Sequence, residues 1–227
     1  MDISIIIPTL NEEQNIGRLI DRLLTESTDQ FEIIVVDGGS KDNTTDIADA
    51  KGAKIIKTGA CRAAQMNAGA EIAQFSNLYF VHADTLPPIG FIEDLSSIKT
   101  RGYKAGCYRS KFVGGPFILK MNAFFTRFNW LFVRGGDQSL FIDRSYFFEL
   151  GKYDEEMCIM EEYPLIDRIM KANYWKVLPK VIEIDTRKYD NRSWLIVNKA
   201  DLSAFRMFKK GEPSEKIKKH YKEMLSI

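Results

Sequence analysis

The chain has 227 residues, of which 45% are hydrophobic and 28% are charged, and its formal net charge at pH 7 is +1. This composition is typical of a globular domain, and so small a net charge excludes a nucleic-acid partner held by bulk electrostatics. Three cysteines without metal-ligand spacing argue against a disulfide framework or a zinc site and favour a cytoplasmic protein. Every apolar run is shorter than the roughly 18 residues of a membrane span.

The first sixty residues alternate between predicted strands and predicted helices. The apolar, β-branched runs Ile3–Ile7 and Phe31–Val36 indicate buried parallel strands, and Ala53–Lys57 is a third, shorter strand. The helix after the first strand is expected to have Asn11 as its N-cap and shows helical spacing of apolar residues over 16–24. A second helix precedes the third strand. This order is typical of the nucleotide-binding half of a doubly wound parallel sheet.

Polar side chains follow the strands at their carboxyl ends. Asp37 comes directly after the second strand, and His82-Ala83-Asp84 follows a short apolar run at 78–81. Ligands of open α/β sheets bind beyond these strand ends, so His82 and Asp84 are candidate ligands of a divalent metal. The alternative is that Asp84 only caps the turn before the next proline.

Small residues dominate the predicted helix at 59–70, where Arg62, Gln65 and Asn67 are interspersed. Small side chains allow close packing under a bound nucleotide, and Arg62 would meet a base carbonyl or a phosphate. The alternative is a closely packed alanine-rich helix whose arginine is merely exposed.

An aromatic-rich stretch occupies residues 117–133 and is interrupted by charged and polar residues. Two interpretations stay open. A helix buried in the core is the more common arrangement, and a helix whose apolar face meets a partner, a lipid or a membrane interface is the alternative.

Two polar clusters follow. The glycine-bearing turn at 134–138 contains Asp137 and Gln138 and is a plausible floor for a polar ligand. Glu161 and Glu162 stand at the start of a predicted helix, either as a general base or as favourable charges of the first turn.

The last part of the chain is basic. One or two strands are predicted over 175–184, followed by a loop in which Arg192 could reach phosphates, and by a helix over 195–210. The lysine-rich tail reads as another helix, either a solvated face or one attracted to anionic lipid headgroups.

Taken in order, these segments resemble family 2 glycosyltransferases with the GT-A fold, over about residues 3–195. Four segments carry the resemblance: Ile5-Ile6-Ile7-Pro8-Thr9-Leu10-Asn11-Glu12, Val36-Asp37-Gly38-Gly39-Ser40-Lys41-Asp42-Asn43-Thr44, His82-Ala83-Asp84 at the DxD metal position, and Glu161-Glu162 at the Glu-Asp position. The runs 62–70 and 136–138 resemble a small bacterial and archaeal subgroup without a membrane-spanning extension.

The resemblance implies one GT-A domain over 1–227, an α/β fold with a Rossmann-like nucleotide-binding half and a mostly parallel central sheet flanked by helices. The nucleotide-sugar-binding half would cover 1–100, the acceptor-side half 101–195, and a helical tail 196–227.

The implied activity is inverting transfer of a sugar from a UDP- or GDP-linked donor to an acceptor hydroxyl. The side chains implied around the donor are Pro8, Asn11, Glu12, Asp37, Arg62, Gln65, Asn67, His82, Ala83, Asp84 and Arg192. Asp84 would hold Mg²⁺ or Mn²⁺, with His82 standing where the family has its first aspartate. Glu162, one methylene longer than the family's usual aspartate, would be the base, with Glu161 as second choice, and Asp137 and Gln138 would shape the acceptor site.

Two alternatives belong to other functional classes. A nucleotidyltransferase would carry a glycine-rich basic loop after the first strand, whereas residues 8–12 are acidic and lack glycine. The replacement at His82 motivates a binding module for nucleotide-sugars that has lost catalysis. The acceptor stays open between a lipid-linked molecule, a glycan and a small metabolite, and the expected location is the cytoplasm or the inner face of a membrane as a peripheral protein.

Overall fold

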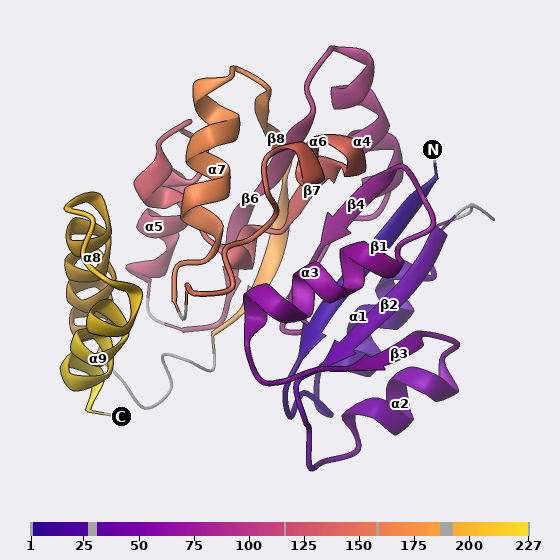
Figure 1. The fold of residues 1–227 in the computed structure, drawn as a ribbon, viewed down its shortest axis with the longest axis horizontal. Helices are drawn as coiled ribbons and strands as arrows, with labels where there is room; N and C mark the ends of the chain where they lie inside the picture. The colour runs from indigo at the N-terminus through magenta and orange to yellow at the C-terminus, as the bar shows by residue number, and fades with distance from the viewer. Residues whose placement is uncertain (1, 27–30, 116, 158, 187–192, 227) are drawn as a thin grey trace.

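The computed structural model describes residues 2–26, 31–115, 117–157, 159–186 and 193–226. Within these ranges the chain forms one eight-stranded mixed sheet with helices on both of its faces (Figure 1). The strand order is β3-β2-β1-β4-β7-β6-β8-β5. The predicted α/β class is confirmed.

The first half of the sheet is parallel, as predicted. Strands β3, β2, β1 and β4 lie side by side, and each pairs in parallel with the next. The elements of this half are β1 (Ile3–Thr9), α1 (Ile16–Leu23), β2 (Phe31–Asp37), α2 (Thr44–Ala50), β3 (Lys54–Lys57), α3 (Arg62–Ile72) and β4 (Asn77–Phe80).

The second half reverses direction. Strand β7 runs antiparallel to both β4 and β6, β6 and β8 are parallel, and β5 is antiparallel to β8. Its elements are β5 (Thr85–Leu86), α4 (Phe91–Thr100), β6 (Ala105–Val113), α5 (Leu119–Phe125), the 3₁₀ turns η1 (Leu131–Val133) and η2 (Gly136–Gln138), β7 (Leu140–Asp143), α6 (Arg144–Glu149), α7 (Glu162–Lys171), β8 (Trp175–Asp185), α8 (Trp194–Lys209) and α9 (Ser214–Leu225).

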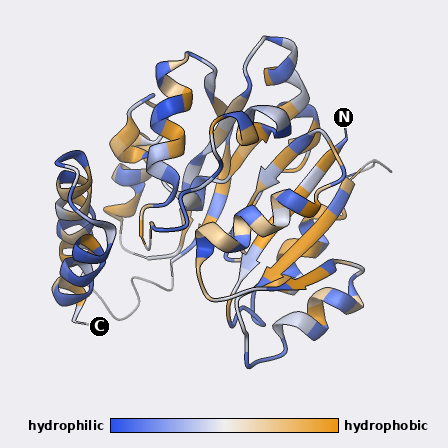
Figure 2. Ribbon diagram, in the orientation of Figure 1, coloured by the Kyte–Doolittle hydropathy of each residue, from blue (hydrophilic) through white to orange (hydrophobic). Residues whose placement is uncertain are grey.

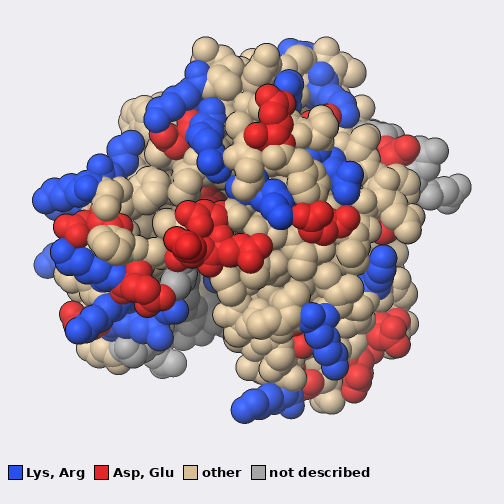
Figure 3. Space-filling view, in the orientation of Figure 1, with Lys and Arg blue, Asp and Glu red and all other residues tan. Residues whose placement is uncertain are grey.

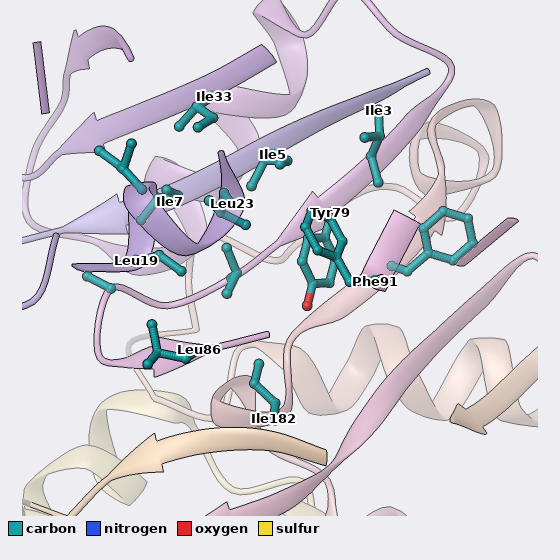
Figure 4. Close-up of a cluster of buried hydrophobic side chains, with 14 of the residues drawn as sticks. Ile3, Ile5, Ile7, Leu19, Leu23, Ile33, Tyr79, Leu86, Phe91 and Ile182 are labelled. Carbon is teal, nitrogen blue, oxygen red and sulfur yellow. The ribbon is translucent and has the colours of Figure 1, made fainter. Parts of the chain in front are cut away.

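The alternation of side chains along β1 divides the core into two layers. Ile5 and Ile7 point toward α1 and α4, in the cluster that Figure 4 shows around the stacked rings of Tyr79 and Phe91. Ile6 points the other way, toward α3, α6 and α7. Apolar residues therefore run continuously along the central strands and lie under helices on both faces (Figure 2).

The loop after β1 differs from the prediction. Strand β1 continues through Pro8 to Thr9, and α1 begins only at Ile16, with Asn15 rather than Asn11 at its N-cap position. Asn11 instead has φ of +56°, a left-handed conformation that asparagine tolerates. The chain turns here, away from the helix, because the side chain of Asn11 is engaged by the loop after β2.

The aromatic stretch is the second difference, because most of its rings are exposed and the buried-core interpretation is wrong. Helix α5 has only seven residues. The chain then wraps around the buried guanidinium of Arg134, which donates hydrogen bonds to the carbonyls of Thr126 and Phe128 (2.9 Å for Phe128). With these backbone groups held inward, the neighbouring rings are left on the outside.

The two C-terminal helices lie together beside α5 (Figure 1). Their contact with it includes a small apolar cluster of Leu119, Val197, Ala200 and Leu225, and a 3.0 Å hydrogen bond from Asn122 to Asn198. None of the helices in the described ranges combines the length and apolarity needed to cross a bilayer.

Gly69 provides a test of the packing of α3 on β1 and β2. A Cβ atom added there would lie 2.5 Å from Cγ2 of Ile6 and 3.1 Å from Cγ2 of Val36. We expect Gly69→Ala to lower the free energy of unfolding by about 1–3 kcal/mol, the usual cost of overpacking. Denaturant unfolding measures this. Gly59→Ala is the matched control, because the same atom there meets nothing within 4 Å. Equal stability of the two variants would contradict the close packing of α3 on β1.

Candidate active site

The carboxyl ends of β1, β2 and β4 meet at one edge of the sheet. Thr9 pairs with Asp37 at the ends of β1 and β2, and Ile6 pairs with Phe80 at the end of β4. The carboxylate of Asp37 is buried and accepts hydrogen bonds from the backbone N–H groups of Gly39 and Ser40, both at 3.0 Å. The predicted position of a polar group at the end of β2 is confirmed, and this group is held rigidly.

The loops after β1 and β2 are tied to each other. The N–H of Asn11 donates to the hydroxyl of Ser40 (2.8 Å), and the side-chain oxygen of Asn11 accepts from the N–H of Lys41 (2.9 Å). The N–H of Glu12 donates to the hydroxyl of Thr44 (2.8 Å). Asn11, Glu12 and Asp37 therefore belong to one rigid surface. Pro8 is buried beneath it in β1.

Gln65 and Asn67 lie on α3, and their amides bond mainly to backbone groups. The amide nitrogen of Gln65 donates at 2.8 Å to the carbonyls of Thr9 and Val36. The amide of Asn67 donates to the carbonyl of Tyr153 (2.9 Å) and accepts from its N–H (3.1 Å). The amide nitrogen of Asn67 also donates to Oε1 of Glu155 (2.8 Å). Both side chains are buried. They hold the strand ends and the chain before α7 in place, and this role was not apparent from the sequence.

Asp84 lies where β4 gives way to β5, half-buried, and lines a cavity of about 80 Å³ together with Asp185 at the end of β8. The N–H of Asp185 donates to the carbonyl of Asp84 (3.0 Å). The cavity is far smaller than the roughly 300 Å³ or more of typical ligand sites, so a large ligand would lie over the open strand ends. The sequence analysis did not single out Asp185, although it stands at the end of a predicted strand.

Among the residues that the structure describes, no group of three or more His, Cys, Asp or Glu side chains is arranged as a complete metal site. A hard cation such as Mg²⁺ needs only one or two carboxylates when phosphate oxygens and water supply its other ligands. The half-buried carboxylate of Asp84 fits that kind of shared site, with the neighbouring Ala83 buried beneath it.

Glu161 and Glu162 are buried side by side at the start of α7. Nη1 of Arg62, at the start of α3, lies 3.0 Å from Oε1 of Glu161, and the Arg62 side chain is still 54% exposed. Burial, and then the charge of Glu161, raise the pKa of Glu162 to about 8, although Arg62 opposes the shift. A carboxyl group with a pKa near neutrality suits proton transfer.

Asp137 lies between this acidic pair and His82-Ala83-Asp84, the triplet at which the sequence predicts a metal. Its Oδ1 lies 3.9 Å from Nδ1 of His82, and its charge acts on both Glu162 and Arg62. Its neighbour Gln138 is buried and donates to the carbonyl of Val133 (2.7 Å). The structure thus brings His82, Asp137, Arg62 and the two glutamates together, and turns Gln138 inward. Arg192 lies outside the described residues.

A family model described as "Glycosyl transferase family 2" matches residues 4–143, more than half of the chain. A search of curated proteins finds no match for this chain.

Solved structures share the fold at low sequence identity. TarS 1–349 of S. aureus in complex with UDP-GlcNAc matches with a TM-score of 0.66 and 19% identity, covering 99% of this chain and 72% of that one. Glucosyl-3-phosphoglycerate synthase of Mycobacterium tuberculosis with Mn²⁺, UDP and glucosyl-3-phosphoglycerate matches with a TM-score of 0.63 and 19% identity, covering 93% and 81%. The mannosyltransferase PcManGT of Pyrobaculum calidifontis with GDP-Man and Mn²⁺ matches with a TM-score of 0.68 and 14% identity, covering 96% and 67%.

Proposed function

Because the chain belongs to glycosyl transferase family 2 and has the GT-A fold, we propose that it transfers a sugar from a UDP- or GDP-linked donor to an acceptor hydroxyl. The observation that carries this proposal is that the side chains of the candidate site adjoin one another. A run of titratable and charged side chains from His82 through Asp137 to Arg62 and the two glutamates connects His82-Ala83-Asp84 with a candidate base.

The donor would lie over the ends of β1, β2 and β4, on the half of the chain that comprises residues 1–100. Asn11, Glu12 and Asp37 would contact its base and ribose, because their backbone groups are already fixed in place. The exposed guanidinium of Arg62 would face the diphosphate, where a forked donor of hydrogen bonds suits phosphate oxygens.

Asp84, with His82 as a second contact, would hold Mg²⁺ or Mn²⁺ against the two phosphates. When bound, such a cation neutralises the charge that develops on the leaving diphosphate. The structures of two other members of the fold, the mycobacterial synthase and PcManGT, contain Mn²⁺.

Glu162 would take the proton from the acceptor hydroxyl, and Asp137 would border the acceptor. The acceptor oxygen then forms a bond to the anomeric carbon from the face opposite the leaving group. The bond from that carbon to the phosphate oxygen breaks, and its electron pair stays on the nucleoside diphosphate. One displacement of this kind inverts the anomeric configuration.

Thermal unfolding in the presence of a panel of nucleotide-sugars tests the donor. A donor at about 100 times its dissociation constant stabilises a folded protein by about 2.7 kcal/mol, enough for a clear rise in the melting temperature. We expect a UDP- or GDP-sugar to do this with Mn²⁺ and to do it less after chelation of the metal. No stabilisation by any member of the panel would contradict the proposal.

The pH dependence of transfer tests the base. Since Glu162 acts as a base only after losing its proton, kcat/KM should rise with pH, with a midpoint near the pKa of about 8. Glu161→Gln should move the midpoint to lower pH because it removes a neighbouring negative charge. Arg62→Gln should move it higher. A profile that neither variant shifts would assign the base to another group.

A further inference from the structure

An exposed aromatic surface lies between β6 and β7 in the chain, on α5 and directly before and after it. We call the aromatic surface the side chains of Phe117, Phe124, Phe125, Phe128, Trp130 and Phe132, each between 36% and 75% exposed. The rings of Phe128 and Trp130 stack at 4.6 Å, and those of Trp130 and Phe132 at 5.5 Å. Stacked rings gathered on the outside of a protein mark an interaction surface rather than scattered exposure.

Two cations lie directly on these rings. Nζ of Lys120 is 5.0 Å from the ring centre of Phe117, and Cζ of Arg127 is 3.9 Å from that of Phe124. Residues 111–136 contain four Lys or Arg and no Asp or Glu, although the whole chain has a net charge of only +1. Of these four, Arg134 is buried and Lys111 pairs with Glu183, so Lys120 and Arg127 supply the charge at the rings. The aromatic surface is therefore also the centre of a positively charged segment.

The neighbouring C-terminal helices extend this positive region. Residues 193–226 contain eight Lys or Arg and four Asp or Glu. Figure 3 shows the blue and red side chains of these helices at the left of the molecule, beside α5 in the view of Figure 1. The net positive charge of these two segments exceeds the net charge of +1 of the whole chain, so the remainder of the chain is net negative.

We propose that the aromatic surface docks the protein on a lipid bilayer with anionic headgroups. Phe and Trp rings bury at the boundary between headgroups and acyl chains, while Lys and Arg among them contact lipid phosphates. A second copy of this chain is a poorer occupant, because a two-fold contact pairs this surface with itself and would bring the cations Lys120 and Arg127 of one copy onto the equally positive surface of the other.

The aromatic surface leads toward the candidate base. The ring of Phe132 lies 6.4 Å from that of Phe205 on α8, and Phe205 lies 5.4 Å from Tyr163, the residue after Glu162. Docking would therefore turn the acceptor side of the site toward the bilayer. This consequence rests on the proposed function, whereas the docking itself does not.

Co-sedimentation of the full chain with vesicles tests the charge. We expect binding to phosphatidylcholine vesicles that contain phosphatidylglycerol, weaker binding to phosphatidylcholine alone, and a decrease with salt. Each basic residue near an anionic surface contributes about fivefold to partition, so Lys120→Gln with Arg127→Gln should weaken binding about 25-fold. The matched control, Lys54→Gln with Arg101→Gln, removes two exposed charges elsewhere and should leave binding unchanged.

A second pair of variants tests the rings. Phe124→Ser with Phe128→Ser should abolish most of the vesicle binding, whereas Leu24→Ser with Ile89→Ser, which removes exposed apolar side chains from another part of the surface, should not. Equal binding by both double variants would overturn the proposal.

Trp130 gives a readout that needs no destabilising change. Brominated lipids should quench part of the tryptophan fluorescence of the wild-type protein, and Trp130→Phe should bind vesicles normally with that quenching lost. No vesicle binding, or a wild-type dimer in sedimentation velocity that the Phe124→Ser with Phe128→Ser variant dissociates, would overturn the docking. Stabilisation by a nucleotide-sugar would still stand in that event, so the two proposals fail separately.

Discussion

Glu162→Gln should retain nucleotide-sugar binding and lose transfer by about 10²–10⁴-fold, the range that a positioned general base contributes. The substitution keeps the size of a side chain that is 6% exposed and removes its ability to accept a proton. Donor affinity should stay unchanged, because the residues proposed to contact the nucleobase and ribose of the donor lie on loops other than the start of α7. Steady-state transfer rates, paired with calorimetric titration of the donor, separate these two effects.

The stability of the same variant supplies its control. Burial holds the pKa of Glu162 at about 8, above the value of 4.5 for an unfolded carboxyl. Its contribution to stability is therefore present below pH 4.5 and is lost as the pH rises through 8. Glutamine does not titrate, so the variant should gain stability relative to the wild type at alkaline pH. Full transfer activity in a folded Glu162→Gln protein would place the base elsewhere.

Asp84→Ala should remove the dependence of donor binding on the metal. Loss of a group that only supports a metal ligand costs about 10- to 100-fold in affinity or activity, so loss of the ligand itself should cost about 100-fold or more. Titration of UDP or GDP with and without Mn²⁺ measures the effect, and the metal should no longer strengthen nucleotide binding in the variant.

Two further variants sharpen this test. Asp84→Asn keeps the shape of the side chain and removes its charge, so it should resemble the alanine variant if the carboxylate holds the cation. Asp49→Ala, an exposed carboxylate on α2, should leave the titration unchanged. Metal-enhanced binding that persists in both Asp84 variants would exclude Asp84 as the ligand.

The sequence predicted where polar groups follow strands, because strands and the residues that end them are local features. Asp37 and Asp84 come after apolar runs that the sequence predicts as buried strands, and they lie at the carboxyl ends of β2 and β4. Asn11 was placed in the right loop but wrongly as the N-cap of the next helix, because its side-chain oxygen accepts from the N–H of Lys41, thirty residues away in sequence. Gln65, Asn67 and Gln138 carry amides that bond to backbone groups, and no local pattern distinguishes that role from contact with a ligand.

The α/β class and the parallel first half of the sheet, with polar groups at the ends of its strands, were determined by the sequence itself, through the periodicity of apolar residues along each segment. Tertiary structure alone decided which charges meet. Arg62 and Glu161 are 99 residues apart in sequence, and Asp137 meets His82 because β4 pairs with β7, with Phe80 opposite Leu140. Tertiary structure also left the rings after α5 on the surface, because the buried Arg134 donates hydrogen bonds to the backbone carbonyls of Thr126 and Phe128 and holds them inward. Contacts between such distant residues depend on the order of the strands in the sheet and on which polar groups are buried. Neither property can be predicted from a single stretch of residues.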